Sequence, residues 1–191
     1  MGRHQTFDTA EVVRAARTVF WEHGYEDASI PDLEAATGLK RSSIYHAFDS
    51  KRGLFDAAVN SYLDEVVRPR IRPLITEPVS PDAIVEYLAG LRAALRQAGS
   101  FHAENGCLLI NAAGAPIAHD AAVRESVAAY RAELHEAIRS GIAARFPERP
   151  AGEVDRLAET CTALVVATFA LTRVDADAAV GSLDAAVRLL G

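Results

Sequence analysis

Basic and hydroxyl-bearing side chains gather in one short stretch of the chain. They are Lys40, Arg41, Ser42, Ser43, Tyr45 and His46, followed closely by Lys51. Such groups donate hydrogen bonds to phosphate oxygens, and arginine or tyrosine side chains also reach the edges of bases. The stretch from Thr37 to Arg52 holds four basic residues and one acidic residue, which gives a local charge of +3. The chemistry predicted for these seven side chains is therefore contact with DNA.

Two short helices are expected to position this stretch. They cover residues 29–37 and about 41–48, and Gly38 between them allows the positive φ of a tight turn. Two helices joined by a short turn that contains glycine form a helix-turn-helix, whose second helix enters the major groove of DNA. The packed side is expected to hold Leu33, Ala36, Leu39 and Ile44. The polar side chains are then left on the exposed face of the second helix, whose N-terminus carries a partial positive charge.

The block from Gly38 to Phe55 resembles the DNA-binding motif of the TetR family of bacterial transcriptional regulators. The resemblance rests on Gly38, Tyr45, Phe48, Lys51, Leu54 and Phe55. It implies a homodimer whose two recognition helices bind a palindromic operator in double-stranded DNA. Carried over by position, it implies DNA contacts by Ser42, Ser43, Tyr45, His46 and Lys51, with Lys40 and Arg41 beside them.

Two residues depart from the family pattern. Glu34 stands where these motifs usually have alanine, so its longer side chain must pass out between the helices, and Ala47 replaces a common aromatic or histidine. The alternative for the whole block is an ordinary solvated helix face, with Tyr45 a core residue whose hydroxyl lies at the surface.

The net charge of the 191-residue chain is −6, which is unusual for a DNA-binding protein. Acidic residues lie mainly outside the basic stretch, and charges more than roughly 8 Å apart are largely screened at physiological salt. An acidic body with a basic tip is expected to bind DNA in one orientation.

Helical periodicity dominates the chain, so the predicted fold is all-α with about nine helices. Residues 1–55 are assigned to a helix-turn-helix domain and 56–191 to an effector-binding and dimerisation domain. Helix N-caps are expected at Asp8, Ser50 and Asp120, and the second helix is expected to start at Ser29 with Asp32 in the capping position. The prolines from Pro69 to Pro81 are expected to end the fourth helix and form a connector.

A helix from about Gly152 to Arg173 is apolar on nearly all sides, which predicts burial both in its own domain and against a partner. With the final helix it is expected to form a four-helix interface in a homodimer. The TetR resemblance implies the same interface through the last two helices.

A pocket for an unknown small-molecule effector is expected between the helices of the second domain. The candidate lining residues are Tyr62, Tyr87, Phe101, His102, Cys107, Asn111, His119 and Tyr130. Each has the alternative of being plain core. For Cys107 the alternatives are a buried inert thiol, favoured by its apolar neighbours, and a sensor of oxidants or electrophiles, which needs an exposed thiolate.

Other classes of protein find little support in the sequence. No metal-ligand spacing, nucleophile motif or phosphate-binding glycine loop is present, so neither a catalytic residue nor a cofactor or metal is predicted. The longest apolar run, Ala163–Leu171, is far shorter than the ~20 residues of a membrane span. Two cysteines give no disulfide framework, which favours the cytoplasm. The sequence therefore predicts a ligand-responsive repressor, with a helical protein-interaction adaptor as the alternative.

Overall fold

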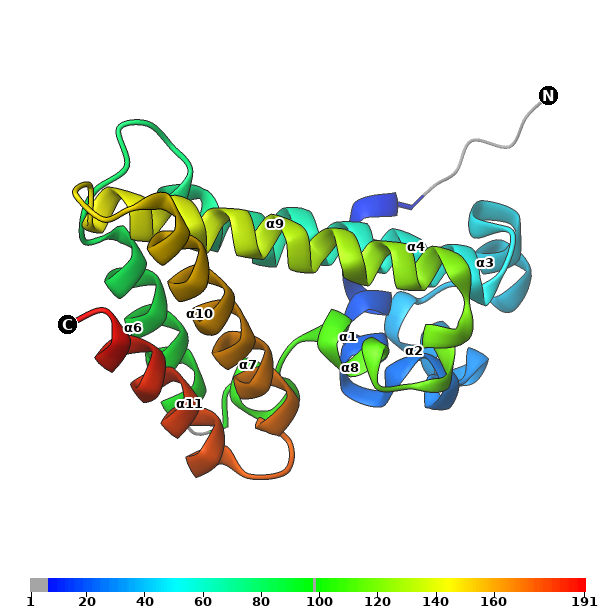
Figure 1. Cartoon of the computed structure of the whole chain (residues 1–191). Helices are drawn as coiled ribbons and strands as arrows, with labels where there is room; N and C mark the ends of the chain where they lie inside the picture. The colour runs from blue at the N-terminus through cyan, green and yellow to red at the C-terminus, as the bar shows by residue number, and fades with distance from the viewer. Residues whose placement is uncertain (1–6, 98) are drawn as a thin grey trace. The chain divides into compact units, whose positions relative to one another are not determined.

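The computed structural model describes residues 7–97 and 99–191, and within them the chain is helical without a strand (Figure 1). The chain forms two compact units, Met1–Glu65 and Val66–Gly191. The all-α prediction is confirmed. The expected division after residue 55 lies inside a helix of the first unit. The assignment of DNA binding to one unit and effector binding to the other stays a prediction.

Four helices make up the first unit: α1 (Thr9–Asp27), α2 (Ile30–Thr37), α3 (Arg41–Phe48) and α4 (Lys51–Tyr62). The expected N-caps are confirmed, since Asp8 accepts from the amides of the first turn of α1 and Ser50 accepts from the Gly53 amide. Ser29 and Asp32 form a reciprocal capping box at the start of α2. These caps satisfy amides that a helix N-terminus leaves without a partner.

The core of the first unit is aromatic and aliphatic. Phe20 and Phe55 pack edge to face with ring centroids 5.2 Å apart, and Leu33, Ile44 and Leu54 are fully buried between the helices. The expected burial of Ala36 is wrong, because Ala36 is exposed. The eight-residue helix α2 buries Leu33 alone, so its buried stripe is narrower than the sequence pattern indicates.

The expected break at Pro69 is also wrong. After α4 the chain continues through a π-helical turn (Leu63–Val67), α5 (Arg68–Ile71) and a 3-10 turn (Arg72–Leu74). Pro69 lies in the first turn of α5, where the missing amide hydrogen of proline is tolerated. The segment expected to be a connector is therefore helical as far as Leu74.

The second unit is a helical bundle in which α10 packs against both α9 and α11, and α11 packs against α6 (Figure 1). Its helices are α6 (Ala83–Arg96), α7 (Phe101–Asn105), α8 (Leu108–Ala113), α9 (Ala121–Arg145), α10 (Ala151–Leu171) and α11 (Ala176–Leu189). The nine predicted helices are present, and the described part of the chain adds the short helices α5 and α7. No helix in that part combines the length and apolar character needed to cross a bilayer.

Gly141 in α9 lies at a close contact in the bundle core. A methyl group there would lie 2.7 Å from Leu74 Cδ2 and 3.1 Å from Ile84 Cβ, and both of these side chains are fully buried. Gly90 in α6 is the opposite case, because a methyl group at Gly90 would meet no atom within 4 Å.

We expect Gly141→Ala to lower the free energy of unfolding by about 1–3 kcal/mol, since overpacking outweighs the better helix propensity of alanine. The control Gly90→Ala gains propensity without a clash and is expected to raise the same free energy by up to about 1 kcal/mol. Urea denaturation at matched protein concentration measures both. Equal effects of the two substitutions would contradict the close contact.

Candidate functional site

Six of the predicted DNA-contacting side chains lie on α3 or at its N-terminal end, and Lys51 begins α4. Ile44 is fully buried and fixes the helix to the core. Around it, Ser42 and His46 are exposed and Ser43 and Tyr45 are half-buried. The turn before α3 is made by Gly38, whose φ of 69° places it in the left-handed region expected from the sequence. The turn at Gly38 and the buried Ile44 side chain together orient α3 so that its polar face is exposed.

Arg41 and Tyr45 lie one helical turn apart and interact. The guanidinium carbon of Arg41 is 5.3 Å from the centroid of the Tyr45 ring, which is within cation–π distance. This contact limits the positions that the exposed Arg41 side chain can adopt. The two side chains therefore form one surface of combined cationic and aromatic character.

Glu34 caps the N-terminus of α3 from the preceding helix. Its Oε1 accepts the backbone amide of Arg41 at 2.6 Å, whereas Lys40 at the N-cap position gives no side-chain cap. A carboxylate at this end of a helix is stabilised by the helix dipole. The side chain that departs from the family pattern thus ends on α3 itself, and it occupies an amide that could otherwise bind a phosphate.

Lys51, the first residue of α4, is held in place by the end of α1. Its Nζ donates to the Glu26 carbonyl at 3.2 Å and lies 4.6 Å from the centroid of the Tyr25 ring. Burial lowers the pKa of Lys51, and the negative charges of Glu26 and Asp27 oppose that shift. An ammonium group has three donors, so this contact leaves capacity for a phosphate. The ammonium is therefore positioned before any ligand arrives.

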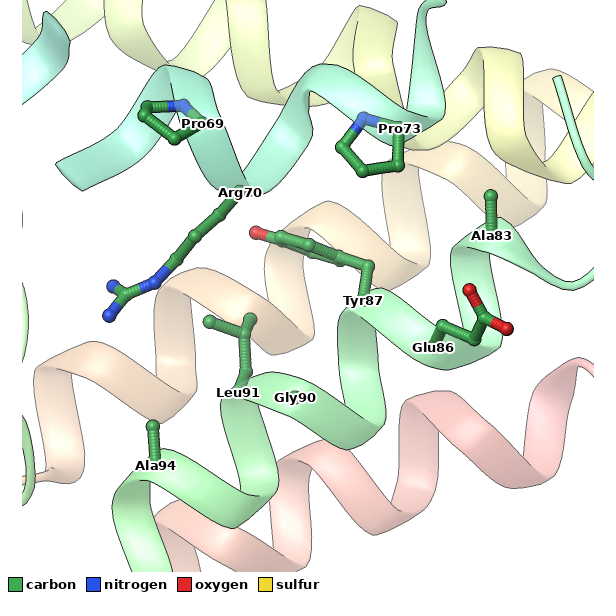
Figure 2. A pocket seen from close by; sticks show the side chains of 9 residues that line it. All are labelled: Pro69, Arg70, Pro73, Ala83, Glu86, Tyr87, Gly90, Leu91 and Ala94. Carbon is green, nitrogen blue, oxygen red and sulfur yellow. The ribbon is translucent and has the colours of Figure 1, made fainter. Parts of the chain in front are cut away.

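The second unit contains a cavity of about 360 Å³ between the α5 segment and α6 (Figure 2). It is lined by Pro69, Arg70, Pro73, Ala83, Glu86, Tyr87, Gly90, Leu91 and Ala94. Of the residues proposed for an effector pocket, Tyr87 lines this cavity. Its half-buried ring extends across the cavity from α6, and burial raises the pKa of Tyr87 strongly.

Of the other predicted pocket residues, His102 contacts Arg70 of this cavity, and Cys107 contacts Tyr130. Arg70 donates to His102 Nε2 at 2.9 Å, and burial, followed by the positive charge of Arg70, lowers the pKa of His102. Cys107 is fully buried, with its Sγ 3.6 Å from the hydroxyl oxygen of Tyr130. The burial of Cys107 agrees with the inert-thiol alternative, because an oxidant sensor needs an exposed thiolate.

The other predicted pocket residues lie elsewhere. Tyr62 belongs to the first unit, where its buried ring packs edge-on against Trp21 at 4.7 Å. Asn111 donates to the Asn105 carbonyl at 2.8 Å, Phe101 is half-buried at the start of α7, and His119 is exposed. Sequence reasoning missed Arg70, because the segment that carries it was expected to be an irregular connector.

Taken together, α1 to α4 form a helix-turn-helix DNA-binding domain, and comparison with known proteins gives the family. Residues 12–58 match the model of the bacterial regulatory proteins, tetR family. The HTH-type regulator YezE of Bacillus subtilis is 34% identical over 74% of this chain and 72% of its own length. The repressor ComR of Escherichia coli is 34% identical over 58% of this chain, and the match spans about half (51%) of ComR.

A solved structure gives the same result over nearly the whole chain. The TetR-family regulator CifR, determined with a 26-bp double-stranded operator, superposes with a TM-score of 0.77 and 27% identity. That superposition covers 97% of this chain and 98% of CifR. The chain therefore belongs to the tetR family of bacterial regulatory proteins. It is a DNA-binding transcriptional regulator.

Two substitutions of Glu34 separate the contribution of its hydrogen bond to the stability of α3 from the contribution of its charge. Glu34→Ala removes the acceptor for the Arg41 amide, so we expect the free energy of unfolding to fall by about 0.5–2 kcal/mol. Glu34→Gln keeps an acceptor oxygen without the charge and is expected to lose less. Chemical denaturation of both variants gives the comparison. If alanine were tolerated as well as glutamine, the proposed role of the cap would be wrong.

Proposed function

We propose that this regulator is a homodimeric repressor that releases a palindromic operator when a small molecule binds its second unit. The observation that carries the proposal is the exposed cationic and hydroxyl-bearing face of α3, on a chain that superposes with CifR over nearly its full length. Relatives such as ComR are named as repressors. The protein would act in the cytoplasm, where bacterial DNA is found, and would need no cofactor.

The proposed DNA contacts fall into two groups. Ser42, Ser43, Tyr45 and His46 face the major groove, where hydroxyl and ring groups reach base edges and nearby phosphates. Lys40, Arg41 and Lys51 bind phosphates. Exposure of Lys40 and Arg41 and the fixed position of Lys51 support this division. The first group would set operator preference and the second would set affinity.

The proposed dimer interface is formed by α10 and α11. The buried stripe of α10 includes Val154, Cys161 and Val165. A second stripe, Leu157, Leu164 and Leu171, repeats every seven residues and is half-buried in a single protomer. Such a repeat suits packing against another helix. These three leucines remain partly exposed in a single protomer, which supports the expected interface through the last two helices.

Release of DNA would follow from a change in the spacing of the two recognition helices. A dimer reads two half-sites whose centres are about 34 Å apart, one turn of DNA. A ligand that binds better to a conformation with another spacing shifts the population towards it and lowers operator affinity. The proposed effector site is the cavity lined by Arg70 and Tyr87.

Selection of duplexes from a random pool tests DNA use and two-fold assembly in one experiment. We expect the enriched sequences to contain an inverted repeat with half-site centres about one or two helical turns apart. Enrichment of a single, asymmetric half-site would argue against the dimer. No enrichment, together with no retention of duplexes at low salt, would refute the proposed function.

Lys40 offers the cleaner test of phosphate contact, because Lys51 also supports the packing around Tyr25. Lys40→Ala should weaken binding to every duplex and reduce the slope of log affinity against log salt. Each lost phosphate contact changes that slope by about 0.9, or about 1.8 for a two-fold dimer. Fluorescence anisotropy over a salt series measures it. The control is Arg72→Ala, an exposed cation in the second unit, which should leave the slope of the parent protein unchanged.

A further inference from the structure

We propose that the cavity between the α5 segment and α6 binds a small monocarboxylic acid, with the carboxylate on Arg70 and an apolar body against α6. This inference rests on the proposed function in taking the cavity as the effector site, and it specifies the chemical class of the effector.

Arg70 is a charged group whose charge is not balanced by a neighbour. It is half-buried, and its hydrogen-bond partner is His102 Nε2 at 2.9 Å. Among the described residues no carboxylate lies within 4 Å of its guanidinium, whereas nearby Arg68 pairs with Glu133 at 3.0 Å. A partly desolvated cation without a counter-ion is costly. The site therefore favours an anionic ligand.

His102 does not supply the missing negative charge. The Arg70 guanidinium is always a donor, so the Nε2 atom that faces it must accept with a lone pair. The pKa of His102 is lowered by burial and by Arg70, which keeps the ring neutral. A neutral imidazole therefore orients the guanidinium through one of its donors and leaves others for a carboxylate. Arginine binds carboxylates through two parallel hydrogen bonds where geometry allows.

The rest of the cavity wall suits a hydrocarbon. Pro69, Pro73, Leu91 and Ala94 are apolar, and Gly90 leaves the α6 side open. In Figure 2 the Tyr87 ring lies across the cavity between Arg70 and Glu86 and offers an aromatic face to a ligand. The volume of about 360 Å³ is within the range of small-molecule sites. Such a wall selects an acid with an apolar body over a free inorganic anion.

Glu86 weakly disfavours a second negative charge on the ligand. Figure 2 places Glu86 on the side of the cavity away from Arg70, and its side chain is exposed. A second carboxylate on the ligand would be repelled by this charge, although only weakly, because solvent screens it. A cationic ligand would be repelled by the half-buried Arg70 and would gain only a weak ion pair with the exposed Glu86. The charges of Arg70 and Glu86 together favour a ligand with one carboxylate and a neutral apolar body.

The test uses three probes with one hydrocarbon body: 4-phenylbutanoate, 4-phenylbutan-1-ol and 4-phenylbutylamine. Binding to the full chain is measured by calorimetry without DNA. We expect the acid to bind at least about tenfold more tightly than the alcohol or the amine, since hydrogen bonds to charged groups contribute more than neutral ones. Equal affinity for the acid and the alcohol would overturn the proposal.

Three variants locate the effect. Arg70→Gln should remove the preference for the acid over the alcohol, and the matched charge loss Arg72→Gln, outside the cavity lining, should keep it. Gly90→Leu should weaken the binding of every probe by filling the cavity, and its Cβ meets no neighbour within 4 Å. If Arg70→Gln does not fold, loss of acid binding in Gly90→Leu still tests the site. Undiminished acid binding in either Arg70→Gln or Gly90→Leu would contradict it.

A separate measurement keeps this inference apart from the proposed function. Operator affinity is measured by anisotropy with and without saturating 4-phenylbutanoate. Tight acid binding without operator release supports the ligand class and contradicts the repressor mechanism. Release by the alcohol in place of the acid supports the mechanism and contradicts the ligand class.

Discussion

The proposed DNA-binding surface depends on the packing of the buried Ile44 side chain in the core of the first unit. A helix of eight residues is not stable alone in water, so α3 exists because the core of the first unit holds it. Ile44 is the fully buried residue of α3, and Leu33 has the same role in α2. Once these two side chains are fixed and Gly38 sets the turn, the direction of each polar residue of α3 is determined by helix geometry. The proposed recognition surface is thus a consequence of core packing.

Glu34 stabilises the start of α3 but weakens the attraction of this helix end for phosphate. Glu34 satisfies the Arg41 amide, but it adds a negative charge where the helix dipole would otherwise attract an anion. Phosphate attraction must then come from side-chain cations. Lys51 is suited to this role, because the Glu26 carbonyl and the Tyr25 ring hold its ammonium group in one place. A preorganised cation loses less conformational entropy on binding than a free one.

Local sequence signals predicted the first unit well because each rests on a short-range interaction. Caps such as Ser50, the turn at Gly38 and the span of α3 depend on residues a few positions apart. The errors occurred where distant packing decides. Ala36 has the right spacing for burial but lies outside the narrow contact of α2, and Pro69 is accommodated in a first helical turn. The roles of Arg70 and Glu34 depend on neighbours that spacing does not reveal.

Burial gives the cations of the two units different properties. Lys40 is exposed, so its attraction for a phosphate is screened by salt and acts on any duplex sequence. Arg70 is half-buried beside a cavity, where a lower effective dielectric strengthens each interaction and makes an absent partner costly. The first kind of site suits rapid, reversible association with a long polymer. The second suits selection of one small molecule among many. A regulator that links DNA release to an effector needs both kinds of site, and the two sites proposed for this chain are built from basic residues that differ in burial.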